Sequence, residues 1–319
     1  MSGRRRDIDA LAAGLMLFLC VVWGLNQVAV KLTNAGISPL LGAGLRSLGA
    51  VVLLWAWSAA RGIRLFARDG SLIPGIVAGV LFAAEFAAIF IGLNHTSASR
   101  AVVFLYCSPF FVAIGTHWLV PSERLALRQV AGMILAFVGI VVAFGEGLTG
   151  TGVDTVFGDA MMLAAGFVWG ATTVTVRVWL SGISANKTLF YQLAVSAILL
   201  PLLSAAFAEP GLERPTMLVW AALAWQVVVV AFATYLAWFW LITRYPAAQL
   251  AAFSFLTPLF GLLFGAVLLG EHVTPILILA MALVAAGIWL VSRRHAGEAA
   301  GGLSAEESAT AADPRLGSS

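Results

Sequence analysis

Apolar residues in this chain are grouped into long runs that short polar segments interrupt. The hydrocarbon core of a bilayer is about 30 Å thick, so a helix rising about 1.5 Å per residue needs about 20 apolar residues to cross it. In lipid, backbone groups must be satisfied within the span, which favours helices. The pattern predicts ten transmembrane helices, at 10–30, 39–60, 72–93, 99–119, 129–147, 157–179, 187–207, 217–241, 247–269 and 275–292.

Composition supports a membrane protein of the all-α class. Hydrophobic residues make up 61% of the chain and charged residues 10%, against roughly 45–50% and about 25% in soluble proteins. The net charge of +3 comes without a basic, aromatic-rich stripe, so we expect no nucleic-acid partner. Cys20 and Cys107 lie in apolar runs, and the histidines show no ligand spacing. We therefore expect no metal and no cofactor.

The basic residues predict the orientation of the spans. If the amino terminus is cytoplasmic, the outer segments hold only Lys31, Arg100 and Arg214, whereas Arg46 lies inside a span. The inner segments hold Arg4, Arg5, Arg6, Arg61, Arg64, Arg68, Arg124, Arg128, Arg177, Lys187, Arg244, Arg293, Arg294 and Arg315. This bias follows the positive-inside rule. We expect a multi-pass protein of a bacterial inner (plasma) membrane with both termini in the cytoplasm.

The two halves of the chain resemble each other. The segment 23–31 is similar to 169–177, and 90–109 is similar to 239–258, at nearly the same offset. A repeat of five spans, an odd number, places the second copy upside down in the membrane. The expected organisation is a cytoplasmic amino terminus, two inverted five-helix repeats and a disordered cytoplasmic tail, with bounds 1–9, 10–147, 157–292 and 295–319.

Several motifs carry a resemblance to a known family. They are Trp23-Gly24, Arg46, and the stretch from Thr96-Ser97-Ala98 through Ser108-Pro109 to Glu123-Arg124, which recurs as Ala247-Ala248, Thr257-Pro258 and Gly270-Glu271. Over about residues 8–294 the chain resembles the drug/metabolite transporter superfamily, in its ten-helix branch with two EamA domains. The resemblance implies a substrate pathway between the halves, alternating access, and export of amino acids or other metabolites. Nucleobases and lipophilic drugs are alternative substrates.

Glu85 is the most informative single residue of the sequence. It is expected about 13 residues into the third span, where a charge costs at least about 2.5–3.5 kcal/mol. Arg46 in the second span is expected at a similar depth, roughly 10–12 Å below the outer surface. One interpretation makes Glu85 a proton-coupling or gating group. The other makes Glu85 and Arg46 a static structural pair.

Other polar and aromatic residues are candidates for lining the pathway. Near the middle of their spans lie Trp23 and its repeat equivalent Trp169. The remaining candidates are Asn26, Gln27, Tyr106, Thr173, Gln192 and Tyr235. Each could instead serve packing or hydrogen bonding between helices. Pro109 and Pro258 fall in equivalent spans, where a kink could be a gating hinge or a static bend.

Residues near the span ends and the small-residue motifs have simpler explanations. We expect Glu123 and Glu271 to cap the helix that follows each of them or to contact solvent. The motifs Gly75-x-x-x-Gly79 and Gly261-x-x-x-Gly265 permit close helix contacts, within the fold or in a homodimer. No intramembrane catalytic pair, selectivity filter or nucleotide-binding loop is found in the sequence, which disfavours an enzyme, a channel or an ATP-driven pump.

Overall fold

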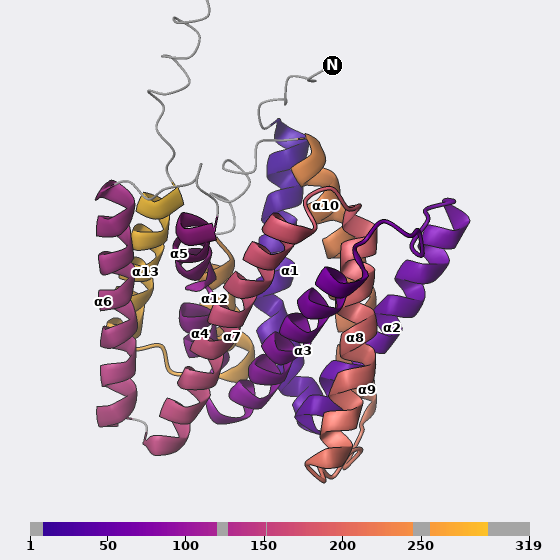
Figure 1. The fold of residues 1–319 in the computed structure, drawn as a ribbon. Helices are drawn as coiled ribbons and strands as arrows, with labels where there is room; N and C mark the ends of the chain where they lie inside the picture. The colour runs from indigo at the N-terminus through magenta and orange to yellow at the C-terminus, as the bar shows by residue number, and fades with distance from the viewer. Residues whose placement is uncertain (1–8, 120–126, 151, 245–255, 293–319) are drawn as a thin grey trace, which may run out of the picture.

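The computed structural model describes residues 9–119, 127–150, 152–244 and 256–292, which are almost entirely helical (Figure 1). The helices are α1 (Ala10–Asn34), α2 (Pro39–Ala60), α3 (Leu72–His95), α4 (Ala98–Leu105), α5 (Ser108–Leu119), α6 (Leu127–Gly150), α7 (Val153–Trp179), α8 (Ala185–Ala206), α9 (Met217–Trp225), the π-helix η1 (Gln226–Thr234), α10 (Tyr235–Arg244), α12 (Leu256–Leu269) and α13 (Pro275–Ser292).

These helices form a ten-helix membrane protein. Seven helical segments of the described residues are long and apolar enough to cross a bilayer, and three shorter apolar helices supply further spans. The fourth predicted span consists of α4 and α5, and the eighth consists of α9, η1 and α10. The predicted span 247–269 lies partly outside the described residues. Its described part is α12.

The two repeats run in opposite directions through the bundle (Figure 1). We call the face where α1 begins the proximal face and the opposite face the distal face. Helix α1 runs from the proximal to the distal face, and its repeat equivalent α7 runs the other way. The predicted inverted arrangement is therefore present in the fold.

Contacts between helices follow the same two-fold relation. Helix α1 packs on α12 and on the span formed by α9 and η1, whereas α7 packs on α4, α5 and α3. Helices α2 and α8 pack on each other, as do α6 and α13. Gly75 and Gly79 lie directly against Tyr191 and Val195 of α8. This small-residue motif therefore serves packing between the repeats inside one chain.

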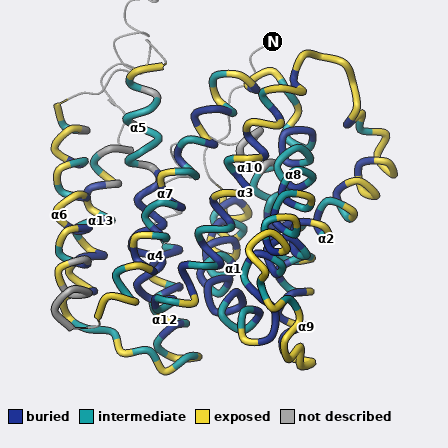
Figure 2. The backbone as a smooth tube through the Cα atoms, turned by 60° about the horizontal axis from the view of Figure 1, so that its bottom comes forward, coloured by how far each residue is buried: buried dark blue, intermediate teal, exposed yellow. Residues whose placement is uncertain are grey.

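Residues inside the bundle are buried, and many residues on its outer side are exposed (Figure 2). Large apolar residues such as Phe18, Trp55, Ile134 and Phe167 are exposed on the outer surface of the bundle. The buried set includes Arg46, Glu85, Asp159 and Gln226, together with a large apolar core. Because lipid solvates apolar side chains, the outer surface needs no polar covering.

Two irregular segments interrupt the helical pattern. The fourth span is broken at Tyr106 and Cys107, and α5 restarts with Pro109 as its second residue, a position that tolerates proline because its missing N–H would be unpaired anyway. Pro258 is the third residue of α12, but residues 245–255 before this helix lie outside the described part. Within the eighth span the chain widens into a nine-residue π-helix, a feature that is frequent at functional sites.

Candidate functional site

A group of polar side chains from five spans and both repeats meets near the breaks in the helices. We call Arg46, Glu85, Tyr106, Tyr235 and Thr257 the central polar cluster. Arg46 comes from α2, Glu85 from α3, Tyr106 from the break between α4 and α5, Tyr235 from α10 and Thr257 from α12. Four of these five residues were predicted from the sequence as pathway candidates, and the fold brings those four together.

Arg46 is fully buried but poorly paired. Its exposed fraction is 0%, and its Cζ lies over the Phe86 ring, 4.0 Å from the ring centroid. Nη2 donates a long hydrogen bond of 3.4 Å to the Tyr235 hydroxyl. Nε and Nη1 have no hydrogen-bond partner among the described residues. The guanidinium is thus held by an aromatic face, with most of its donors unused.

Glu85 is the second incompletely paired charge of the cluster. Its exposed fraction is 6%, and its Oε2 has no hydrogen-bond partner among the described residues. It interacts electrostatically with Arg46, yet within the described residues no ion pair joins the two side chains at 4.0 Å or less. Two opposite charges therefore lie close together without neutralising each other through direct hydrogen bonds.

Tyr106 links the charged pair to the aromatic residues of the second repeat. Its ring meets Trp169 edge to face, with centroids 5.6 Å apart. Its hydroxyl lies near Glu85, Tyr235, Cys20 and Thr257. The Thr257 hydroxyl nevertheless forms no hydrogen bond of ordinary length and angle among the described residues. Several hydroxyl groups thus lie around the charged pair with spare hydrogen-bonding capacity.

Trp23 lies in a second, better paired group. Its indole Nε1 donates a 3.0 Å hydrogen bond to Thr234 at the end of the π-helix, and its ring packs edge to face on Trp238 at 5.7 Å. At the start of the same π-helix, Gln226 Nε2 donates to the Ala29 carbonyl (3.2 Å) and the Thr33 hydroxyl (2.7 Å). The π-helix is therefore tied to α1 at both of its ends.

The remaining predicted residues have different surroundings. Asn26 and Gln27 are buried on α1, and their side-chain oxygens have no partner among the described residues. Thr173 is exposed, and its hydroxyl donates to the Trp169 carbonyl. Gln192 is half-buried on α8. Neither Thr173 nor Gln192 forms a described side-chain contact with the central polar cluster.

The central polar cluster is largely buried, since Arg46 and Thr257 are fully buried and Glu85 and Tyr106 are almost fully buried. A surface hollow of about 260 Å³ runs between α5 and α7, contains no residue of the cluster, and is lined mostly by apolar side chains such as Phe111, Val174 and Trp179. A ligand at the central cluster therefore requires the surrounding helices to separate.

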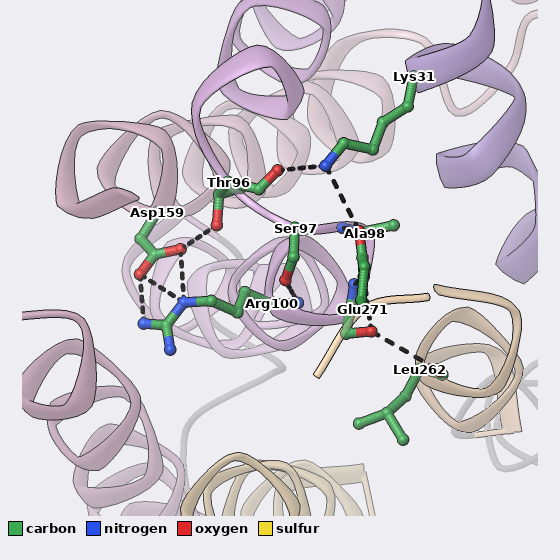
Figure 3. A network of polar contacts seen from close by, with 9 residues as sticks. Lys31, Thr96, Ser97, Ala98, Arg100, Asp159, Leu262 and Glu271 are labelled. Atoms are coloured by element: carbon green, nitrogen blue, oxygen red, sulfur yellow. Dashed lines mark hydrogen bonds and ion pairs between the residues drawn. The ribbon is translucent and has the colours of Figure 1, made fainter. Parts of the chain in front are cut away.

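A second polar network closes the distal face, and the sequence did not predict it (Figure 3). Glu271, between α12 and α13, accepts hydrogen bonds from the backbone N–H of Ala98 (2.7 Å) and Ser99 (2.9 Å), at the start of α4. Lys31 of α1 pairs with Glu271 at 3.4 Å and donates to the Thr96 carbonyl at 2.8 Å. The sequence predicts that Glu271 caps the helix that follows it or contacts solvent. It instead caps a helix of the other repeat, where the helix dipole favours a carboxylate.

Arg100 belongs to the same network and lies inside it (Figure 3). Arg100, which the sequence predicts to lie on the outer side, lies in α4 near its start and has an exposed fraction of 5%. Its Nε and Nη2 donate to Asp159 at distances down to 2.5 Å, and Nη2 also donates to the Ala143 carbonyl. Asp159 is fully buried and accepts a further hydrogen bond from the Thr96 hydroxyl. One feature of the sequence was compatible with this pair: Arg100 and Asp159 both lie near ends of spans that are predicted on the same side of the membrane.

At the proximal face a third contact joins the repeats. Lys187 at the start of α8 donates to both oxygens of Asp69 at 2.8 Å and to the Ala67 carbonyl at 2.6 Å. The Lys187 hydrogen bond, helped by one from Ser71, lowers the pKa of the Asp69 carboxyl to about 2. Asp69 therefore stays ionised at any physiological pH. Among the described residues, no cluster of histidine, cysteine, aspartate or glutamate could hold a metal ion.

Comparisons with known proteins agree with this architecture. The model of the EamA-like transporter family matches the chain twice, over residues 10–145 and 156–293. A "Probable amino-acid metabolite efflux pump" of Salmonella typhimurium is 30% identical over 291 residues, which cover 86% of this chain and 93% of that protein. The Escherichia coli K12 protein of the same description is 28% identical over the same shares. The "Uncharacterized transporter YoaV" of Bacillus subtilis is 24% identical and covers 86% of this chain and 94% of its own length.

One solved structure, described only as the crystal structure of a protein, shares the fold. It superposes with a TM-score of 0.63 at 21% identity and covers 88% of this chain and 97% of its own chain.

Proposed function

The chain belongs to the EamA-like transporter family, and from this premise we propose that it is a secondary exporter of small metabolites such as amino acids that works by alternating access. The observation that carries the proposal is the central polar cluster. Arg46 and Glu85 are buried beside residues of the inverted second repeat, and secondary transporters commonly bind their substrates between such repeats. Several of their hydrogen-bonding atoms have no partner among the described residues, which leaves them available to a ligand.

Energetics support this assignment. Leaving a buried donor or acceptor unpaired costs about 1–3 kcal/mol, and more when the group is charged. Among the described residues, Arg46 Nε and Nη1, Glu85 Oε2 and Thr257 Oγ1 have no hydrogen-bond partner. A packed membrane bundle gains nothing from such groups unless something binds them during the working cycle. A transported solute is such a ligand.

Glu85 is the group through which we expect a proton to couple to transport. A carboxylate buried in the span is costly unless it is protonated or faces a cation. Arg46 lies near but forms no direct ion pair with it, so the charge of Glu85 is only partly compensated. Binding and release of a proton by Glu85 therefore change the net charge of the cluster without breaking a direct ion pair.

The direction of transport, export, is proposed from the resemblance to the family. The positive-inside bias favours a cytoplasmic proximal face, so we expect the distal face to look outward. Contacts between the two repeats hold the distal face together, through Lys31, Glu271 and the start of α4 and through the pairing of Ile37 with Leu212. Release of substrate to the outside requires these contacts to separate.

Counterflow in proteoliposomes tests the proposal. Purified protein is reconstituted, the lumen is loaded with single amino acids, and uptake of the labelled solute is followed with and without a pH gradient. We expect counterflow of one or more amino acids and faster movement when the gradient drives protons against the solute. Luminal pH is followed with a trapped dye, and substrate addition is expected to move protons.

Glu85→Gln tests the coupling role, with Asp154→Asn, an exposed acid at the distal face, as the matched control. We expect the pH gradient to have no effect on whatever rate Glu85→Gln retains, whereas Asp154→Asn responds like the parent. Unaltered pH dependence in Glu85→Gln, with protons still moving, contradicts the coupling role. Absence of counterflow for every metabolite tested contradicts the transport proposal itself.

A further inference from the structure

The end of α2 and the segment that joins it to α3 form a hollow on the outer surface, at the proximal face. Figure 1 shows the last turns of α2 directed away from the rest of the bundle, and residues 61–71 return from there to the start of α3. The hollow has a volume of about 390 Å³, and we call it the α2 hollow. Its lining contains no residue of the central polar cluster, so it is separate from the site proposed for the solute.

Most of the lining of the α2 hollow is apolar. Trp55 and Phe66 line it with exposed fractions of 52% and 74%, and Ala59 and Ile63 contribute further apolar surface. The hollow lies on the outside of a bundle that lipid surrounds, where hydrocarbon chains rather than water contact apolar side chains. Tryptophan is enriched where the hydrocarbon meets the headgroups. The walls of the hollow therefore suit an acyl chain near its headgroup.

Three arginines give the α2 hollow a positive rim. Arg64 is part of the lining, and Arg61 and Arg68 flank it in the same short segment. All three side chains are exposed. The Cζ atom of Arg61 lies over the Trp57 ring, 4.5 Å from the ring centroid, and this contact holds the guanidinium against the end of α2. The rim thus concentrates positive charge at the edge of an apolar hollow.

No acid of the described chain neutralises this rim. Asp69 is the nearest acid in sequence, and both of its oxygens accept hydrogen bonds from Lys187 at 2.8 Å. Among the described residues, none of Arg61, Arg64 and Arg68 forms an ion pair. The rim is therefore complementary to an anion from outside the chain. The positive-inside bias favours a cytoplasmic position for this face, next to the leaflet whose headgroups attract basic segments.

We infer that the α2 hollow binds an anionic glycerophospholipid, with the lipid phosphate on Arg61, Arg64 and Arg68 and an acyl chain against Trp55 and Phe66. Water alone satisfies exposed guanidinium groups, and hydrocarbon alone satisfies an apolar wall. A single molecule with an anionic head and apolar tails satisfies both at once. Guanidinium groups bind phosphate oxygens through paired N–H donors, which adds geometric selectivity to the charge attraction.

A lipid in the α2 hollow contacts a part of the chain that connects the two central charges. Helix α2 carries Arg46 and α3 carries Glu85, and Asp69, in the segment between these helices, is held by Lys187 of α8. A bound lipid fastens the last turns of α2 to this segment. We therefore expect anionic lipid to stabilise the folded protein. The inference depends neither on the identity of the solute nor on proton coupling.

Lipids that differ only in their headgroup test the inference on the unaltered protein. The full chain is purified in a neutral detergent and titrated with phosphatidylglycerol, or with phosphatidylcholine of the same acyl chains. Native mass spectrometry and thermal unfolding follow binding. We expect phosphatidylglycerol to bind about 10-fold or more tightly, since only this lipid brings a net negative charge to the rim. Added salt is expected to reduce that preference.

Glycerol 3-phosphate distinguishes a lipid headgroup from a free phosphate. It carries the phosphate without acyl chains, so it gains nothing from the apolar wall. We expect it to give no stabilisation at concentrations where phosphatidylglycerol saturates the protein.

Substitutions at the rim and at the wall assign the two ends of the lipid. Arg64→Gln is expected to weaken phosphatidylglycerol binding about 5-fold, and Arg61→Gln, Arg64→Gln and Arg68→Gln together about 100-fold, with phosphatidylcholine binding unchanged. Trp55→Ala is expected to weaken both lipids alike. The matched control is Arg177→Gln, an exposed arginine in the last turn of α7 at the same face, which should change phosphatidylglycerol affinity less than about 2-fold.

Three outcomes overturn the inference. Equal binding of phosphatidylglycerol and phosphatidylcholine to the unaltered protein contradicts headgroup recognition, even if every variant fails to fold. Equal losses in Arg64→Gln and Arg177→Gln contradict a site at the α2 hollow, because attraction would then be spread over the whole face. Stabilisation by glycerol 3-phosphate as strong as that by phosphatidylglycerol assigns the rim to a free phosphate. Counterflow is measured separately, so none of these results decides the exporter proposal.

Discussion

Two buried arginines in this protein have opposite surroundings. Arg100, in the distal network, donates to both oxygens of Asp159 and to the Ala143 carbonyl. Arg46, in the central polar cluster, has one long hydrogen bond and two nitrogens without described partners. Their exposed fractions are 5% and 0%, so burial does not distinguish them. The number of satisfied donors does.

The difference teaches how structural and functional charges can be separated in a membrane bundle. A buried charge with a purely structural role must be fully paired, because lipid and apolar side chains offer no substitute hydrogen-bond partner. A charge that binds a transient ligand must leave groups unpaired in the empty protein, at a cost in stability. By this criterion the distal network holds the repeats together, and we propose that the central polar cluster binds the solute.

Breaking the Arg100–Asp159 pair is expected to have the largest effect on stability. Asp159→Asn leaves the Arg100 charge buried without its anion, which destabilises proteins by about 3–5 kcal/mol. Asp154→Asn removes an acid from the same helix that is exposed and pairs with His95, and should cost less than about 1 kcal/mol. Thermal unfolding in detergent measures both, and equal shifts contradict the structural role of the pair.

Removing the charge of Glu271 is expected to have the next largest effect. Glu271→Gln weakens the cap of α4 and its pair with Lys31, and should destabilise the protein by about 1–2 kcal/mol. Glu209→Gln is the matched control because Glu209 caps α2 with longer hydrogen bonds, 3.2 Å to Leu40 and 3.3 Å to Leu41. Denaturant midpoints compare them. If Glu209→Gln lost more stability than Glu271→Gln, the lengths of the hydrogen bonds would not predict how strongly each glutamate stabilises the helix that it caps.

Two buried glutamines sharpen the comparison at lower energies. Gln226→Met removes two donated hydrogen bonds as well as an oxygen without a described partner, and because the two lost bonds outweigh that gain it should cost about 1 kcal/mol. Gln27→Met removes a side chain whose oxygen is unpaired, so unfolding stability should stay unchanged or rise, because an unsatisfied polar group is lost. Melting temperatures and counterflow are measured together. A Gln27→Met protein that loses as much stability as Gln226→Met would assign Gln27 to structure.

The smallest expected effect is the pH dependence of the proximal contact. Lys187 depresses the pKa of Asp69 from 3.8 to about 2, so the contact stabilises the fold above about pH 4. This stabilisation is lost as pH falls through 2. The difference in melting temperature between the parent and Asp69→Asn should therefore shrink from pH 5 toward pH 2. If the difference in melting temperature grew as the pH fell, the ionised Asp69 carboxylate would not be the source of this stabilisation.

Much of the architecture was predictable from local patterns. Spans follow from the length of apolar runs, and the similarity of the segments around Trp23 and Trp169 implied two inverted copies. Arg46 and Glu85 were identifiable because charges deep in apolar runs are expensive. The irregular segments within the helices were only partly predictable from the sequence. Pro109 marked the restart of α5, but no residue pattern indicated the π-helix before Tyr235.

The long-range pairings were not predictable, for a physical reason. Asp159 is 59 positions from Arg100, and Glu271 is 173 positions from Ala98. In sequence, each of these residues is a charge near a span end, the same description that fits a solvated loop residue. Only packing of one repeat on the other decides whether such a charge contacts a helix end, an arginine or water.

The sequence by itself determined that lipid surrounds the chain, that five-helix units are duplicated in opposite orientation, and that few charges lie at depth. These properties depend on residue type and spacing along one helix. Tertiary structure alone decided which buried charges are satisfied, because satisfaction depends on partners brought in from other helices. Arg100 and Arg46 differ in this respect, because the donors of Arg100 find partners on other helices and most donors of Arg46 do not.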